Sequence, residues 1–212
     1  MAETNEESRS ARKHKAIMEA ATTVFLAKGY LGATVDEIAA LAAVSKQTVY
    51  KHFVDKEQLF AAIILATTDD VDEFVRLIAS TLADSADLEK DLRGLARQLL
   101  AALMEPRLLS LRRLVIANAD RLPDVSRAWY ERGFERVLTT LASCFQELRH
   151  ELPRLGEPVL AAHHFVGLLL WIPVNKAMFT GDSHSSTPAE LERYADAAVA
   201  TFLAAYGRVG GR

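Results

Sequence analysis

The apolar residues of this chain recur with the period of an α-helix along most of its length. Between Ile17 and Phe25 they follow the i, i+3, i+4, i+7, i+8 spacing of one buried stripe, and Gly29 then provides a C-terminal stop. Alternating runs of β-branched residues, which are typical of half-buried strands, are lacking. The pattern therefore predicts an all-α protein.

Residues 34–60 predict two short helices, a tight turn between them, and the start of a third helix. Thr34 and Glu37 have the spacing of a capping box, in which each side chain bonds to the other residue's backbone N–H, so a helix begins there. Ser45 is a favourable N-cap for a second helix that runs to about Phe53. Two short helices joined by a few small residues cross steeply, which indicates a helix-turn-helix.

The second of these helices is expected to present a polar face. Val49 and Phe53 lie four residues apart and point inward, which leaves the other side chains at or near the surface. Lys and Gln pair with base edges, Thr offers a methyl and a hydroxyl group, and Tyr and Lys suit phosphates. For any one residue alone, a solvated face is the alternative. The outward residues are Lys46, Gln47, Thr48, Tyr50, Lys51 and His52.

Four segments between residues 10 and 60 form a pattern more specific than a bare helix-turn-helix. They are FLAKGY (25–30), TVDEIA (34–39), VSKQTVYKHF (44–53) and DKEQLF (55–60). Together they resemble the DNA-binding domain of the TetR family of bacterial regulators. The matching part covers about a quarter of the chain, and beyond it family members share architecture rather than motifs.

This resemblance implies a homodimeric transcriptional regulator, most simply a repressor, that binds a palindromic DNA operator through two copies of its head. Ser45 would cap the recognition helix. The residues expected to contact bases are Lys46, Gln47 and Thr48. Those expected to hold phosphates or frame the groove are Thr34, Tyr50, Lys51, His52 and Lys56.

From Asp55 the apolar residues keep a helical period to about Leu82, which predicts one continuous helix that leaves the head and enters the body. In the family, the tilt of this connector sets the spacing of the two heads. With the later helices this gives about nine in all, over roughly 87–104, 107–119, 124–149, 157–179 and 187–206. We expect a disordered tail (1–8), a helix-turn-helix domain (9–54) and a helical ligand-binding and dimerisation domain (55–212).

The last two helices differ from the others. The helix over 157–179 is apolar around most of its circumference, and Thr187 to Glu190 is a capping box with Pro188 at the first helical position. An apolar surface of this kind needs cover from outside its own domain. The resemblance implies that the two helices pair with their copies in a second subunit. Binding of a different chain is the alternative.

The resemblance also implies that a small, mainly apolar effector enters the body and releases the protein from DNA. Aromatic and histidine side chains of the later helices are the candidates to line its pocket, although core packing is the simpler role for each of them. These candidates are Trp129, Phe145, His163, Phe165, Trp171 and Phe179.

Charge is unevenly distributed along the chain. The whole protein has a formal net charge of −3, whereas residues 9–56 carry eight Lys or Arg against four Asp or Glu, leaving the remainder acidic. A basic head on an acidic body fits a phosphate partner. The single cysteine, Cys144, excludes an internal disulfide framework. Together with the absence of a signal-peptide core, and with an apolar run (161–174) too short and polar to span a bilayer, it predicts a cytoplasmic protein.

The sequence has no Gly-rich phosphate loop, His-Glu-x-x-His pair, CxxC motif or nucleophilic serine elbow, so we expect neither an enzyme nor a cofactor. His163 and His164 point about 100° apart on one helix and cannot both face a metal ion unless Cys144, His150 or His184 assists. A helical enzyme or small-molecule carrier that keeps the head as a scaffold is the alternative function.

Overall fold

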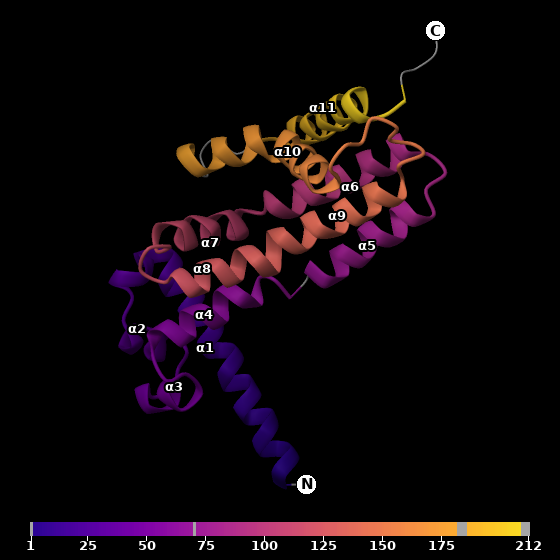
Figure 1. Ribbon diagram of the computed structural model, residues 1–212. Coiled ribbons are helices and arrows are strands. Elements are labelled where there is room, and N and C mark those ends of the chain that lie inside the picture. The colour runs from indigo at the N-terminus through magenta and orange to yellow at the C-terminus, as the bar shows by residue number, and fades with distance from the viewer. Residues whose placement is uncertain (1, 70, 182–185, 209–212) are drawn as a thin grey trace. The chain divides into compact units, whose positions relative to one another are not determined.

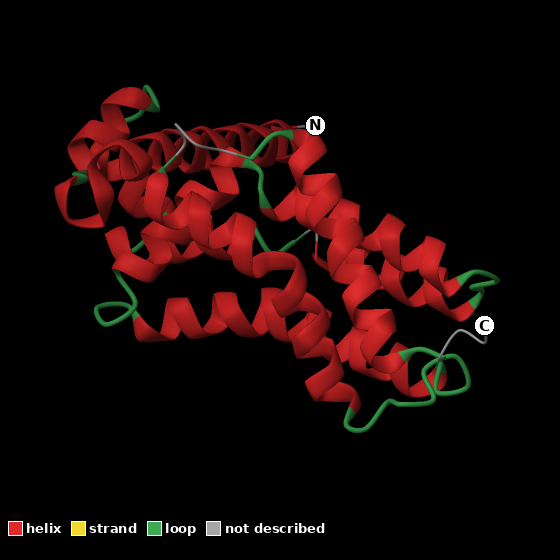
Figure 2. Cartoon of the chain, turned by 90° about the horizontal axis from the view of Figure 1, so that it is seen from above, coloured by secondary structure: helices red, strands yellow, loops and turns green. Residues whose placement is uncertain are grey.

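The computed structural model describes residues 2–69, 71–181 and 186–208, and every regular element in these ranges is helical (Figures 1 and 2). The all-α prediction is confirmed. The elements are α1 (Ala2–Gly32), α2 (Val35–Leu41), α3 (Lys46–His52), α4 (Lys56–Ala66), α5 (Val71–Ala83), α6 (Leu88–Leu103), α7 (Pro106–Ala117), α8 (Pro123–Tyr130), a π-helical segment η1 (Glu131–Glu135), α9 (Arg136–Glu147), α10 (Pro158–Thr180) and α11 (Pro188–Tyr206).

The chain folds into two compact units. The first contains Met1–Asp69 and Ser110–Trp129, and the second contains Asp70–Leu109 and Tyr130–Arg212. We did not expect a later segment of the chain in the same unit as the helix-turn-helix. The assignment of residues 9–54 and 55–212 to separate functions stays a prediction.

In the first unit, α1 packs against α2 and α4. Phe25 and Phe60 are buried there, with ring centroids 5.3 Å apart in an edge-to-face contact. Gly29 has a φ of 71°, a left-handed value that glycine adopts readily, and it interrupts the helical backbone where we expected α1 to stop. At its other end, α1 begins at Ala2, so the helix starts within the segment that we expected to be disordered.

The connector is not one helix, and the prediction of a continuous element from Asp55 to Leu82 is wrong. Helix α4 ends at Ala66 and α5 begins at Val71. The hydroxyls of Thr67 and Thr68 donate to the carbonyl oxygens of Ile64 and Leu65 at 2.6 and 2.7 Å. Short polar side chains of this kind compete with the helical backbone for its hydrogen bonds, and α4 ends where they occur.

The second unit has one apolar core. The rings of Phe145 (α9), Phe165 (α10) and Phe202 (α11) meet there, with centroids between 4.9 and 5.9 Å apart. Helix α9 packs on α5 and α10, and α11 packs on α6 and α10.

The predicted helix over 124–149 corresponds to α8, η1 and α9, which follow one another without a break. The Thr187 capping box is present at the start of α11, as predicted.

Candidate DNA-binding site

The helix-turn-helix is fixed at both helix starts by side-chain caps. The Thr34 hydroxyl accepts from the Glu37 N–H, and the Glu37 carboxylate accepts from the Thr34 N–H, both at 3.3 Å. In the turn, Ala43 adopts a positive φ of 51°. The Ser45 hydroxyl then accepts from the Thr48 N–H at 3.1 Å and so begins α3. Both predicted caps are confirmed, and they set the direction of α3 relative to α2.

Helix α3 has one buried side and one exposed side. Val49, at 1% exposure, and Phe53, at its C-terminal end, point into the unit. Thr48 and His52 are half-buried, and the Thr48 hydroxyl lies 2.8 Å from that of Ser45. The polar face that the sequence predicted is therefore present. Its exposed members are Lys46, Gln47, Tyr50 and Lys51.

Lys46 is held by a neighbouring carboxylate. Its ammonium lies 3.0 Å from the Asp36 carboxylate of α2, and this hydrogen bond raises the pKa of Lys46. Both side chains are exposed, and an ion pair in water contributes little stability. Lys46 can therefore exchange Asp36 for a base edge or a phosphate at small cost.

The basic start of α1 lies close to the recognition helix. Figure 1 shows the first turns of α1 projecting beyond α2, α3 and α4. The His14 ring lies 5.6 Å from the His52 ring and 4.9 Å from the Phe53 ring, centroid to centroid, which joins α1 to the end of α3. The exposed cations on this stretch of α1 are Arg9, Arg12, Lys13 and Lys15.

Lys56 is directed toward the protein's own backbone. Its ammonium donates to the carbonyl oxygens of Tyr30 at 2.9 Å and Ala33 at 3.0 Å, and it lies 4.6 Å from the centroid of the Tyr30 ring. The side chain is half-buried. The expectation that Lys56 holds DNA stays a prediction, and in the protein without DNA its ammonium is bonded inside the first unit.

The residues expected to line a ligand pocket fall into three groups. Phe145 and Phe165 are packed in the core of the second unit, whereas Trp129 belongs to the first unit. Three others lie on the exposed side of α10: His163, Trp171 and Phe179. Core packing accounts for the first two, and exposure argues against an interior role for the last three.

Sequence reasoning missed Arg112, which lies beside Trp129. The Arg112 guanidinium lies 5.8 Å from the centroid of the Trp129 ring, and burial lowers the pKa of Arg112 to about 10. The Trp129 indole N–H donates to the Thr67 hydroxyl at 2.9 Å. The available signal was an Arg pair inside the apolar run from Leu108 to Ile116, but the pattern does not show which of the two Arg residues is buried.

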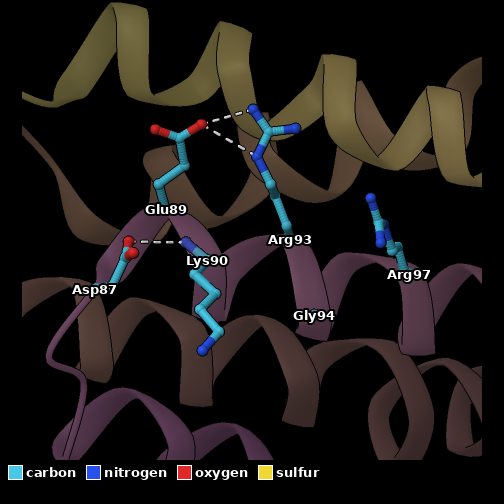
Figure 3. A pocket seen from close by; sticks show the side chains of 6 residues that line it. All are labelled: Asp87, Glu89, Lys90, Arg93, Gly94 and Arg97. Carbon is cyan, nitrogen blue, oxygen red and sulfur yellow. Dashed lines mark hydrogen bonds and ion pairs between the residues drawn. The ribbon is translucent and has the colours of Figure 1, made fainter.

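An open cleft of about 500 Å³ lies along α6 (Figure 3). Arg93 turns toward Glu89, with a shortest distance of 2.6 Å (Figure 3). Arg97 bonds to both carboxylate oxygens of Asp196 in α11 at 3.1 and 2.8 Å. None of the residues expected to bind a ligand lines this cleft. Its lining consists of Asp87, Glu89, Lys90, Arg93, Gly94 and Arg97.

Within the described ranges, no group of three His, Cys, Asp or Glu side chains is placed to hold a metal ion. His164 is instead 2.5 Å from the Tyr206 hydroxyl through its Nδ1. His184 lies outside the described residues. Burial raises the pKa of the Cys144 thiol, as in an apolar site where the thiol stays protonated.

Two family models match the chain. Residues 17–63 match the model described as bacterial regulatory proteins, tetR family, and residues 90–208 match the model described as AefR-like transcriptional repressor, C-terminal domain. The second match alone covers more than half of the protein. The chain belongs to the TetR family of bacterial transcriptional regulators. The helix-turn-helix of α2 and α3 is therefore the DNA-binding motif of this TetR-family protein.

Individual relatives agree with this assignment. A crystal structure described as that of a TetR-family transcriptional regulator from Mesorhizobium loti is 53% identical and covers 94% of this chain and 99% of that chain, with a TM-score of 0.84. The structure of the flavonoid-responsive regulator FrrA is 29% identical over 93% of this chain and 98% of its own, with a TM-score of 0.67. The transcriptional activator FasR of Mycolicibacterium smegmatis is 38% identical over 32% of each chain, so the match spans about a third of that curated relative.

Helix α10 has 23 residues, and its most apolar 18-residue stretch has a mean hydropathy of 1.4. By length and composition it could cross a membrane, which we had not expected of this region. Core helices of soluble proteins meet the same criterion. About two fifths of its most apolar stretch is buried within the chain. This one helix is therefore weak evidence for a membrane location.

Proposed function

We propose that this TetR-family regulator is a cytoplasmic, homodimeric repressor that leaves a palindromic operator when a small, mainly apolar molecule binds. The observation that carries the proposal is the exposed polar face of α3, anchored beneath by Val49 and Phe53. A short capped helix with such a face has the shape and chemistry to enter the major groove. Residues 9–54 would form the reading head, and residues 55–212 the ligand-binding and dimerisation part.

Within that head, we assign base contacts to the N-terminal end of α3, at Lys46, Gln47 and Thr48. Ser45 acts as the cap. Phosphate contacts or groove framing fall to Thr34, Tyr50, Lys51 and His52. Two heads related by a two-fold axis would contact half-sites about one helical turn, or a multiple of it, apart.

The dimer is supported by the exposed side of α10. Trp171 is 71% exposed and Phe179 is 87% exposed, and Ile172, Leu168 and Val159 are also exposed on this helix. Several large apolar side chains exposed on one helix indicate an interaction surface. Exposed alanines of α11, including Ala197 and Ala204, would allow a second copy to approach closely. A self-complementary interface then relates the two heads by symmetry.

The effector is assigned to the aromatic, apolar class. The responsiveness of the relative FrrA to flavonoids supports this class, and the AefR-like repressor description of the C-terminal model supports repression over activation. Such a molecule shifts the DNA-binding equilibrium only by the difference between its affinities for the two conformers.

The test is a footprint on the intergenic DNA upstream of the protein's own gene, repeated with a panel of flavonoids and other small aromatic compounds. We expect two protected half-sites and loss of protection with an active compound. Tight binding of a compound by a protein that protects no DNA would instead favour a carrier or enzyme. Mass measurement in solution distinguishes a homodimer from a complex with another chain.

A further inference from the structure

Lys56, the first residue of α4, has a set of contacts that the proposed DNA-binding role does not explain. Its ammonium reaches two backbone carbonyl oxygens, those of Tyr30 and Ala33, and the face of the Tyr30 ring. An ammonium group has three N–H donors. Two of them bond to backbone carbonyl oxygens, and the ring contact also holds the ammonium group against the protein.

These carbonyl groups need an outside donor because of the capping box. In a continuing helix the Tyr30 carbonyl would accept from the Thr34 N–H, and the Ala33 carbonyl from the Glu37 N–H. Both N–H groups are used elsewhere: Thr34 donates to the Glu37 carboxylate, and Glu37 donates to the Thr34 hydroxyl. The same cap that begins α2 therefore leaves two acceptors that Lys56 satisfies.

The position of Lys56 is otherwise unfavourable for a cation. The N-terminus of a helix carries partial positive charge, and anions are preferred there. The flanking residues follow that preference, since Asp55 is the N-cap of α4 and Glu57 is in its first turn. The contacts with Tyr30 and Ala33 offset the cost of placing a cation at this helix end.

The Tyr30 ring extends this attachment into the core of the first unit. Its centroid lies 5.1 Å from that of Phe60 on α4 and 6.0 Å from that of Phe25 on α1. Lys56 therefore joins the start of α4 to the corner between α1 and α2. That corner sets where the helix-turn-helix begins.

We propose that Lys56 is a positioning residue for operator recognition, which fixes the α1–α2 corner against α4 so that α3 meets the bases in register, and that it is not a phosphate ligand. The inference rests on the proposed DNA-binding function. A phosphate ligand and a positioning residue differ in measurable ways. Affinity falls as salt rises, and each lost phosphate contact makes the slope of log affinity against log salt less steep by about 0.9. Lost positioning instead reduces specificity and leaves the slope unchanged.

The experiment compares Lys56→Gln with Lys51→Gln, which removes an exposed lysine of α3. Affinities for operator and for unrelated duplex are measured over a salt series, at a temperature where circular dichroism shows each variant fully folded. For Lys56→Gln we expect the ratio of specific to non-specific affinity to fall by about tenfold, the size of one lost base contact, with the wild-type salt slope. For Lys51→Gln we expect a less steep salt slope and an unchanged ratio of specific to non-specific affinity.

A second measurement uses the wild-type protein, so it does not depend on a variant folding. Lysines are acetylated briefly with and without operator, and modification is quantified by mass spectrometry. We expect Lys56 to react at least about tenfold more slowly than Lys51 in the free protein, because its ammonium is held by hydrogen bonds. We expect DNA to protect Lys51 and to leave the reactivity of Lys56 unchanged. Rapid reaction of Lys56 that operator suppresses would overturn the inference.

The remaining outcomes are also decisive. Wild-type slope, ratio and affinity in a folded Lys56→Gln protein would refute the positioning role and leave the proposed function intact. A less steep salt slope for Lys56→Gln, with an unchanged ratio of specific to non-specific affinity, would identify Lys56 as a phosphate ligand. Failure of the wild-type protein to bind any operator would refute the proposed function itself, which the wild-type arm shows before any variant is compared.

Discussion

Helices α3 and α10 each leave one side to solvent, but the two sides have opposite chemistry. Helix α3 buries Val49 and exposes Lys46, Gln47 and Tyr50, whereas α10 buries Phe165 and exposes Trp171. An exposed polar face is hydrated in water, so leaving it without a partner carries no free-energy penalty. An exposed apolar face is stable only when covered. We therefore expect the face of α10 to be permanently covered and that of α3 to bind reversibly.

The largest expected effect comes from charging the apolar face. Trp171→Glu should weaken the homodimer by about 2–4 kcal/mol, the range of an interface hot spot, and abolish operator binding because one head alone holds only one half-site. Analytical ultracentrifugation measures the first effect and gel shift the second. Ile116→Glu is the matched control, since Ile116 is exposed on α7. A wild-type protein that is monomeric at micromolar concentration would contradict the comparison.

A smaller effect is expected from the polar face. Gln47→Ala should cost about 1–3 kcal/mol of operator affinity and relax the preference at one base position, because a base contact is lost while the fold is kept. Affinities for a set of single-base operator variants provide the measurement. Gln98→Ala, which removes an exposed glutamine of α6, should behave as wild type. Equal losses on all DNA sequences would argue that Gln47 does not read bases.

The cap of α3 has a more modest role. Ser45→Ala should lower the free energy of unfolding by about 1 kcal/mol, since the Thr48 N–H loses its side-chain acceptor. Denaturant titration followed by circular dichroism measures the change. Ser143→Ala, at an exposed site within α9, is the control. An unchanged midpoint for Ser45→Ala would show that water replaces the cap without cost.

The smallest effect concerns pH. Burial, reinforced by the nearby His14, Lys51 and Lys13, lowers the pKa of His52 below its usual 6.5. The unfolded chain then binds a proton more readily than the folded head, so stability is full above pH 6.5 and declines as the pH falls toward the folded pKa. His52→Gln should flatten this decline in thermal melts between pH 8 and pH 5, whereas His150→Gln should not.

Local chemistry made the helix starts predictable. Thr34, Ser45 and Thr187 cap their helices through hydrogen bonds that span three residues, so the sequence alone contains the necessary information. The alternation of buried and exposed positions in α3 is equally local. These features are sufficient to recognise the helix-turn-helix and its outward residues.

Features that depend on distant residues were not predictable in the same way. The apolar residues on either side of the polar stretch 67–70 keep the same helical spacing, as from Ile64 to Val71, so the pattern does not show that α4 ends. The charge of Lys56 suggested a phosphate contact at the protein surface. Only the fold shows that the carbonyl groups of Tyr30 and Ala33 lie within its reach. The exposure of Trp171 and Phe179 likewise depends on which side of α10 the other helices cover.

The end of α4 at Ala66 has a mechanical consequence. A helix that stops there cannot act as a lever running on toward Leu82, and its orientation must be set by what holds it locally. Lys56 anchors its first turn, and the Trp129 indole bonds to Thr67 at its last. Because both ends are hydrogen-bonded to other segments of its own unit, α4 can reorient only if one of these contacts breaks.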